Sequence, residues 1–182
     1  MTFHFSTLDE RASGSDNWAI TWADDDHQYT SWGDGGGFGG TNSNGRVSLG
    51  FARVEGPKNN YQGYNVWGGK NPENPAQFEG KCYGIISIDG TLWMWRTGSG
   101  SGSTSYDSQK LYKSTNHSAT WQYAGVEYRT NDFSPSYPRF YAPTFCQFGK
   151  DYAGARDNYV YIYAPETNNS SWNVQIPGRI TL

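Results

Sequence analysis

The chain has 182 residues, of which 35% are hydrophobic, 17% charged and 17% aromatic, and its formal net charge is -3. This composition excludes general disorder, because disordered chains are poor in aromatic residues and rich in charge, and it gives no cationic surface for nucleic acid or anionic membranes. The sequence contains no run of about eighteen apolar residues, which excludes a membrane-spanning helix. Glycine, small polar and aromatic residues replace the strong helix formers, which predicts an all-β fold.

Three segments of the chain repeat one pattern: a strand, a reversal, and a second strand rich in β-branched and aromatic residues. The first hairpin is predicted over residues 16–35, with the polar turn DDDHQ at its tip. The second is predicted over 81–96 around Asp89-Gly90, a dipeptide typical of tight hairpin turns. The third is predicted over 141–165 around the longer turn KDYAGARDN. Four tryptophans fall at strand spacing and are interpreted as core aromatics: Trp22, Trp32, Trp93 and Trp95.

A repeat of about sixty residues with three or four strands in each unit suits the blades of a β-propeller. The three units are predicted at about 15–56, 80–126 and 139–182. Because closed propellers have at least about four blades, the chain predicts an incomplete five- or six-bladed propeller, completed by further blades or by self-association. A β-sandwich, whose strands are also separated by frequent turns, is the alternative. The run GGGFGG is interpreted as a flexible loop at the rim of the propeller funnel.

The most distinctive runs of the chain are SDNWAITWADD, YTSWGDGGGF, VSLGFARVEG, GKCYGIISIDGTLWMW and FCQFGKDYAGARDNYVYIYA. These runs resemble a bacterial family of sialidase-like and arabinanase-like propeller proteins, whose members are often of unknown function or are described as glycoside hydrolases. Residues 114–121, STNHSATW, are similar to the Asp-box of sialidases, a structural turn, with Asn116 and Ser118 in place of its Asp and Gly. The resemblance implies a β-propeller, a carbohydrate partner and an extracytoplasmic or secreted protein.

Within a blade, the start of the first strand and the end of the second strand lie at the same face. This rule places Asp16 and Asp34 together and puts the turn of Asp24, Asp25 and Asp26 at the opposite face. Applied to all three units, it gathers nine candidates at the central funnel: Asp16, Trp18, Asp34, Phe38, Lys81, Arg96, Arg139, Tyr141 and Glu166. We predict that the aromatic and cationic members bind the substrate: Trp18, Phe38, Lys81, Arg96, Arg139 and Tyr141.

Glycoside hydrolysis needs two carboxyl groups in different environments, one protonated and one ionised. The resemblance to arabinanase-like enzymes implies that Asp16, at the start of the first inner strand, is the general base. Asp34 would then tune the pKa of Asp16, orient water or bind a sugar hydroxyl, and Glu166 is the candidate general acid in this chain. A sialidase mechanism is disfavoured, because Arg96 and Arg139 are too few for the three arginines that grip a carboxylate.

Each candidate also has a structural interpretation. Asp16 and Asp34 suit turns, Glu166 suits a solvated loop, and the cations suit ion pairs at the surface or between blades. The main hypothesis is a glycoside hydrolase-like protein that acts on a polysaccharide or glycoconjugate. The alternatives are a non-catalytic carbohydrate-binding or adhesion propeller and an inactive truncated fragment.

No metal or cofactor is expected. The three histidines are scattered along the chain, and three adjacent aspartates in a hairpin turn fit a solvated turn better than a calcium site. The GGGFGG run is not followed by the GK[ST] of a phosphate-binding loop. Cys82 and Cys146 match no metal-binding spacing, and two buried free thiols are favoured over a disulfide.

Overall fold

The computed structural model describes residues 5–97, 108–129, 132, 140, 142–165 and 180–181. Helical structure in this part of the chain is confined to two short 3-10 turns, η1 at Phe5–Thr7 and η2 at Lys150–Tyr152. The remaining regular structure is β-strand, so the all-β prediction is confirmed. Within the described ranges, no helix has the length and apolar character needed to cross a membrane.

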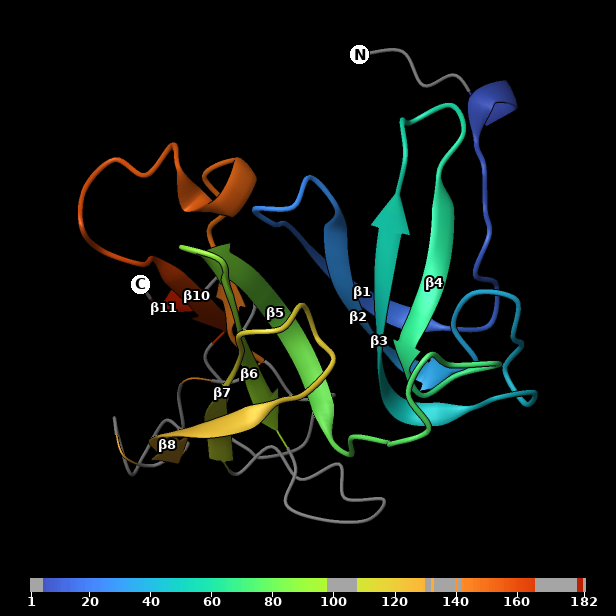
Figure 1. Cartoon of the computed structure of the whole chain (residues 1–182). Coiled ribbons are helices and arrows are strands. Elements are labelled where there is room, and N and C mark those ends of the chain that lie inside the picture. Colours follow the sequence, from blue (N-terminus) through green and yellow to red (C-terminus); the bar gives the residue numbers. More distant parts are fainter. Residues whose placement is uncertain are drawn as a thin grey trace.

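Two antiparallel sheets of four strands form most of the molecule (Figure 1). The first sheet contains β1 (Asp16–Trp22), β2 (Gln28–Gly35), β3 (Val47–Glu55) and β4 (Gln62–Trp67), and the second contains β5 (Lys81–Ile88), β6 (Thr91–Thr97), β7 (Ser108–Ser114) and β8 (Gln122–Arg129). In each sheet every strand pairs with the next strand along the chain. β4 and the end of β8 lie beyond the bounds near residues 56 and 126 that the sequence predicts for the first two units.

A third, smaller sheet follows in the order β11-β10-β9. It contains β9 (Thr144–Phe145), β10 (Ile162–Pro165) and β11 (Ile180–Thr181). All three predicted hairpins are present as the antiparallel pairs β1–β2, β5–β6 and β9–β10. The third is shorter than predicted, because its first strand comprises only two residues. None of the three sheets closes on itself in the described part of the chain.

The second sheet is covered on both faces. Its side chains alternate along each strand, so neighbouring residues enter different cores. Ile85 belongs to a core cluster shared with the first sheet, whereas Ile86 belongs to a cluster shared with the third. The first cluster includes Tyr29, Leu49, Phe51, Ile85, Leu92 and Met94, and the second includes Ile86, Trp95, Phe140, Phe145, Tyr152 and Ala164. The apolar cores therefore lie between stacked sheets.

Hydrogen bonds of the buried Thr21 and of Gln147 join the first strands of the sheets. The hydroxyl of Thr21 in β1 accepts a hydrogen bond from the backbone N–H of Ser87 in β5 (2.9 Å) and donates one to Gln147, just after β9 (3.0 Å). The amide of Gln147 donates to the backbone oxygen of Ile85 (2.7 Å). These bonds satisfy groups that would be costly to bury alone, and they fix the three sheets next to one another.

The outer face of the first sheet is only partly covered. Trp32 is buried there, stacked against the half-buried Trp18 with ring centroids 5.4 Å apart. Farther along β1, Ile20 and Trp22 keep 46% and 45% of their surface exposed. The prediction that Trp22 is a core residue is therefore wrong, because its side chain lies on this uncovered face. The same prediction is confirmed for Trp32 and for Trp95, which is 3% exposed, whereas Trp93 is only half-buried.

Both cysteines are free, as the sequence favours. Cys82 is buried in the core between the first two sheets. Cys146 is only partly buried, so the expected burial of both thiols is confirmed for Cys82 alone.

Candidate functional site

Asp16 and Asp34 come together where β1 begins and β2 ends. In the antiparallel register of these strands, Asp16 lies opposite Gly33, the residue before Asp34. The two aspartates therefore lie at the same end of the hairpin, as the rule for paired strands in a blade predicts. Together with Lys81, these aspartates form what we call the carboxylate centre.

The backbone at the carboxylate centre is unusual. Asn17 and Asp34 have φ angles of 54° and 46°, in the left-handed region that residues other than glycine rarely adopt. The register of β1 and β2 also shifts between Asp16 and Ala19, as at a β-bulge, which redirects side chains near its position. Left-handed residues also occur in turns of this chain, such as Asp26, Asp89 and His117, so the backbone alone does not mark a functional site.

Three polar groups surround Gly33. A Cβ atom at this position would lie 2.7 Å from Oδ1 of Asp16, 3.3 Å from Nδ2 of Asn17 and 3.6 Å from Nζ of Lys81. Groups from β1 and β5 therefore converge over a residue of β2. A side chain at this position would displace the carboxylate of Asp16.

Lys81, the first residue of β5, brings a buried positive charge to the centre. The residue is 4% exposed, and its Nζ lies 2.6 Å from Oδ1 of Asp34 and donates to the backbone oxygen of Ser48 at 3.0 Å. A buried ammonium needs such partners to offset its lost hydration. Lys81 was predicted to bind substrate, but its described partners are protein atoms of the first sheet, which corresponds to the structural alternative of an ion pair between units.

The environment of Asp16 raises its pKa above the ordinary value. Partial burial of its carboxylate is the main cause, although the residue as a whole remains exposed. The negative charge of Asp34 is the second cause, while the positive charges of Lys81 and Arg46 act in the opposite direction. Arg46 lies on the exposed side of the centre, with its NH2 group 3.4 Å from Oδ1 of Asp34. Asp34 therefore influences the pKa of Asp16, one of the three roles considered for it.

Arg96 is held away from these carboxylates by aromatic rings. Its guanidinium carbon lies 5.0 Å from the ring centre of Phe78 and 5.4 Å from that of Tyr112, and it donates a hydrogen bond of 2.9 Å to the Tyr112 hydroxyl. Arg96 pairs with Cys82 across β5 and β6, so its side chain follows the face that packs on the first sheet. The other candidates, Arg139, Tyr141 and Glu166, lie outside the described residues.

Trp18 and Phe38 line a groove on the outer face of the first sheet. Two adjoining cavities of about 510 and 420 Å³ share Trp18, Phe38 and Tyr61 as lining residues. The first cavity also touches Glu10, Arg11, Ser13 and Ser15, and the second touches Ile20, Gln28, Val54 and Lys58. We call this surface the aromatic groove. It combines flat aromatic side chains with charged and hydroxyl groups at its borders.

The GGGFGG segment is anchored at the aromatic groove. The side chain of Asn65 accepts a hydrogen bond from the backbone N–H of Phe38 and donates one to its carbonyl, both at 2.9 Å. The backbone N–H of Gly37 donates to Ser15 (3.0 Å). A Cβ on Gly63 would come within 2.3 Å of the Phe38 ring, so this glycine makes room for the ring. The interpretation of a flexible rim loop is thereby corrected, because the loop is fixed against β4.

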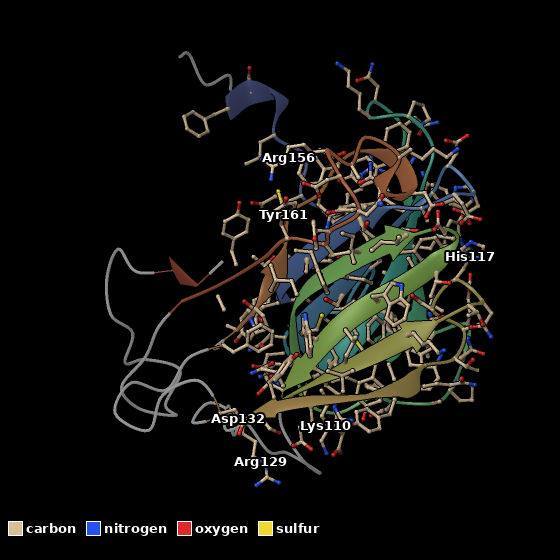
Figure 2. The ribbon with its side chains drawn as sticks, turned by 90° about the vertical axis from the view of Figure 1, so that its left-hand side faces the viewer. Lys110, His117, Arg129, Asp132, Arg156 and Tyr161 are labelled. Atoms are coloured by element: carbon tan, nitrogen blue, oxygen red, sulfur yellow. The ribbon has the colours of Figure 1, made fainter. Side chains whose placement is uncertain are left out.

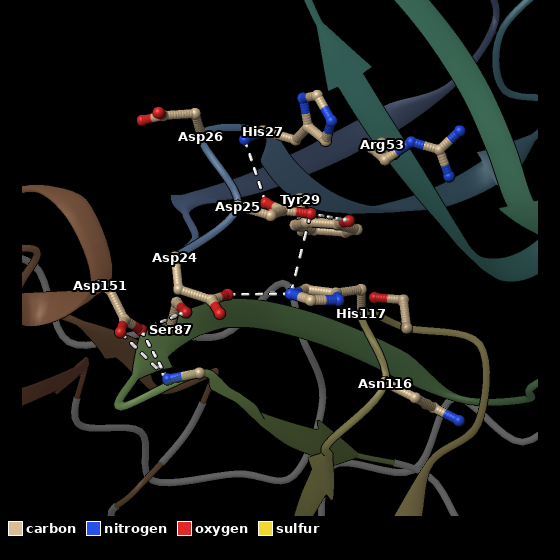
Figure 3. A network of polar contacts seen from close by, with 12 residues as sticks. Asp24, Asp25, Asp26, His27, Tyr29, Arg53, Ser87, Asn116, His117 and Asp151 are labelled. Atoms are coloured by element: carbon tan, nitrogen blue, oxygen red, sulfur yellow. Dashed lines mark hydrogen bonds and ion pairs between the residues drawn. The ribbon is translucent and has the colours of Figure 1, made fainter.

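A second cluster of charges lies at the opposite end of the sheets (Figure 3). Nε2 of His117 is 2.8 Å from Oδ1 of Asp24 and 3.7 Å from Oδ2 of Asp25, and the His117 ring stacks on Tyr29 at 5.4 Å. We call Asp24, Asp25 and His117 the turn cluster. Their ligand-type atoms lie within 4.8 Å of one another, a spacing that would also suit a metal ion, but the carboxylates already bond His117 and the Tyr29 hydroxyl.

His117 belongs to the turn that resembles an Asp-box. Figure 2 shows it at one end of the second sheet, opposite Arg129 at the end of β8. Within this turn, Oδ1 of Asn116 accepts the backbone N–H of Thr120 (2.9 Å), and the Ser114 hydroxyl accepts that of Ser118 (3.0 Å). Asn116 thus supplies a side-chain acceptor where the Asp-box has Asp, and the role of these residues is structural.

Several residues of the carboxylate centre and the aromatic groove were not predicted from the sequence. Gly33 and Asn17 had weak signals, because they neighbour the two aspartates in the motifs SDNW and SWGDG. Arg46 and Tyr61 had none, because their places depend on how loops return to the sheet. No protein-family model matches the chain, and no curated protein matches it. The residues of the carboxylate centre and the aromatic groove therefore carry the functional argument.

Proposed function

We propose that the chain is a glycoside hydrolase-like protein that acts on a polysaccharide or glycoconjugate, with Asp16 as its general base. The observation that carries this proposal is the contrast between the two carboxylates. Asp16 has a raised pKa, whereas Asp34 is held by the buried ammonium of Lys81. Glycosidases tune the pKa values of their catalytic carboxyl groups through the surroundings, and the raised pKa of Asp16 supports such a role.

The proposed mechanism gives each group of the centre a proton or charge to hold. Ionised Asp16 accepts a proton from the attacking water, and its raised pKa makes it a stronger base than an ordinary carboxylate. Asp34 contributes the negative charge that helps to raise that pKa. Glu166 remains the proposed general acid, which would protonate the oxygen of the leaving sugar.

The sheet arrangement supports the propeller part of the proposal. In each four-stranded sheet the strands follow one another in order, as in a propeller blade, whereas Greek-key sandwiches send strands from one sheet to the other. We therefore propose about three blades of a five- or six-bladed propeller, completed by further blades or by self-association. An extracytoplasmic location belongs to the same proposal and rests on the resemblance alone.

The aromatic groove supports a second candidate function, non-catalytic carbohydrate binding. Trp18, Phe38 and Tyr61 line both of its cavities, and binding sites combine such apolar rings with a few polar groups that fix the ligand. Charged and amide groups at the borders, including Arg11 and Gln28, could bond sugar hydroxyls. The groove and the carboxylate centre use different side chains, so substitutions can separate the two functions.

The test measures release of reducing ends from arabinan, xylan, galactan and a sialylated glycoprotein. We expect the wild-type chain to hydrolyse at least one of them, and D16N to lower the rate by about 10²–10⁴-fold, the usual contribution of a general base. The matched control is D89N, the same chemical change in the exposed β5–β6 turn. Equal rates for wild type and D16N on a hydrolysed substrate would refute the assignment of Asp16.

Affinity electrophoresis in gels containing the same polymers tests the second function. For a carbohydrate-binding protein, we expect Y61A to lose retention and D16N to keep it, with no sugar released by any variant. Thermal melts of each variant confirm that it is folded. If none of the four polymers is hydrolysed and none retains the protein, the proposal of a carbohydrate partner is overturned for this set.

A further inference from the structure

Lys81 links the two large sheets at the carboxylate centre. It is the first residue of β5 in the second sheet, yet its ammonium bonds the Asp34 side chain at the end of β2 and the Ser48 oxygen at the start of β3. The ammonium thus leaves its own sheet and is held by the first one. Its position depends on how the two sheets pack.

Lys81 is also more shielded from water than the other cation of the centre. The Lys81 side chain is 5% exposed and that of Arg46 is 45% exposed, and both face the same oxygen of Asp34. Arg46 also bonds the backbone oxygens of Asp34 and Asn42. Because water and salt screen exposed charges much more than buried ones, Lys81 dominates the positive field at the centre.

Four charged groups therefore face one another here, and each comes from a different part of the chain. Asp16 belongs to β1, Asp34 to β2, Arg46 to the loop before β3, and Lys81 to β5. Asp34 adopts a left-handed backbone with φ of 46°, which costs free energy and needs support from its surroundings. The bond to Lys81 supplies such support at 2.6 Å.

We infer that Lys81 is a positioning residue, which holds the Asp34 carboxylate beside Asp16 and balances its charge, and that it does not bind substrate. The catalytic meaning of this inference rests on the proposed function, whereas the charge balance does not. Without Lys81, the negative charge of Asp34 would act on Asp16 unopposed from the buried side.

The test is a carbon-13 NMR titration of the Asp16 carboxyl group in the full chain, which needs no substrate. We expect K81M to raise the pKa of Asp16 relative to wild type, and by more than R46M does. K81R keeps the charge and should stay closer to wild type. The matched control is K150M, which removes a lysine paired with Asp26 at the opposite end and should leave the Asp16 titration unchanged.

The double variant D34N/K81M covers the case in which K81M alone does not fold. It leaves neither charge unpaired, so we expect it to fold, and it differs from D34N only in Lys81. The pKa of Asp16 should therefore be higher in the double variant than in D34N, because the positive charge that lowers it is gone. An Asp16 titration that is the same in wild type and folded K81M, or the same in D34N and the double variant, would overturn the inference.

Failure of the proposed function would give a different pattern. If no glycan is hydrolysed but the Asp16 titration shifts in K81M, the hydrolase proposal fails and the positioning role of Lys81 stands. If a glycan is hydrolysed, the acid limb of the pH–rate profile should move in K81M in the same direction as the NMR titration. A lower rate with an unmoved profile would indicate a merely structural lysine and would also overturn the inference.

Discussion

Two lysine–aspartate ion pairs of equal length lie at opposite ends of the molecule. Nζ of Lys81 is 2.6 Å from Oδ1 of Asp34 at the carboxylate centre, and Nζ of Lys150 is 2.6 Å from Oδ1 of Asp26 at the tip of the first hairpin. Their exposure differs: the Lys81 and Asp34 side chains are 5% and 39% exposed, against 35% and 70% for Lys150 and Asp26. Since ion pairs weaken steeply with solvent access, contact distance alone does not show which pair matters.

The backbone around the two pairs differs in a related way. At the carboxylate centre, a register shift and two left-handed residues bring charged groups over Gly33. At the other end, the charged side chains bond one another and neighbouring turns, and the Asp151 carboxylate bonds the Ser87 hydroxyl (2.7 Å) and the backbone N–H of Gly90 (3.0 Å). Left-handed residues other than glycine occur at both ends, such as Asp34 at the first and Asp26 and Asp151 at the second. The difference is that the first end gathers charges around a buried ammonium, whereas the second uses exposed charges to hold turns together.

The largest effect on stability is expected at the buried pair. D34N removes the carboxylate but leaves the ammonium of Lys81 buried, which should lower the free energy of unfolding by about 3 kcal/mol. Urea denaturation measures this loss. The double variant D34N/K81M should lose less than D34N alone, because no buried charge remains. A loss in the double variant equal to the sum of the two single losses would show that the charges do not interact.

The next prediction concerns Gly33 and its counterpart Gly90. G33A places a methyl group 2.7 Å from Oδ1 of Asp16, so we expect it to displace that carboxylate and to lower hydrolysis about tenfold or more while the fold persists. G90A meets Oδ2 of Asp24 only at 3.3 Å but forces alanine into a φ of +70°, which should cost about 1 kcal/mol of stability and leave hydrolysis unchanged. Hydrolysis assays and thermal melts of both variants measure these effects. A loss of stability in G33A but not in G90A would contradict the prediction.

Much of the carboxylate centre could be predicted from the sequence because it depends on local geometry. A hairpin of two strands returns to its starting end, so Asp16 and Asp34 lie close together regardless of how the rest of the chain folds. The same rule placed Lys81 near them. It could not show that the Lys81 ammonium is buried against Asp34, because that contact depends on packing between two sheets.

The failures of sequence-based prediction also have physical causes. Arg96 lies beside Thr97 at the end of β6 nearest the carboxylate centre, as the hairpin rule predicts. Strand alternation, however, directs its side chain toward Phe78 and Tyr112. β4 was missed because Gly63 and Asn65 interrupt a strand-like pattern. Both residues serve the distant Phe38, which lies on Gly63 and bonds Asn65. Long-range contacts of this kind leave no local signal.

The two ends should respond to pH with opposite signs. The pKa of Asp16 is raised, so the folded state holds its proton more tightly, and stability falls as pH rises from the unfolded value near 3.8 through the folded pKa. The pKa of Asp24 is lowered, chiefly by its hydrogen bond with His117, so its contribution is present above 3.8 and is lost as pH falls through the folded pKa. At neutral pH, D16N should therefore stabilise the chain and D24N should destabilise it.

Thermal melts between pH 3 and pH 7 measure both differences. Each is expected at about 1 kcal/mol or less, because both carboxylates are largely exposed, and each should shrink toward zero at the acid end. D24N should also lose its effect in an H117A background, because the hydrogen bond that lowers the Asp24 pKa is absent there. Differences of the same sign for D16N and D24N at neutral pH would contradict the assigned environments.

The smallest effect is expected at the exposed pair. K150M removes an ion pair as short as that of Lys81, but water reaches both partners, so the melting temperature should hardly change, and any small change should disappear at high salt. K81M, at the same distance, should lower it clearly. The comparison uses the same substitution at two equal contacts, so burial is the main variable that differs. A loss in K150M that matches the loss in K81M would show that contact distance governs these pairs and would remove the basis for treating Lys81 as special.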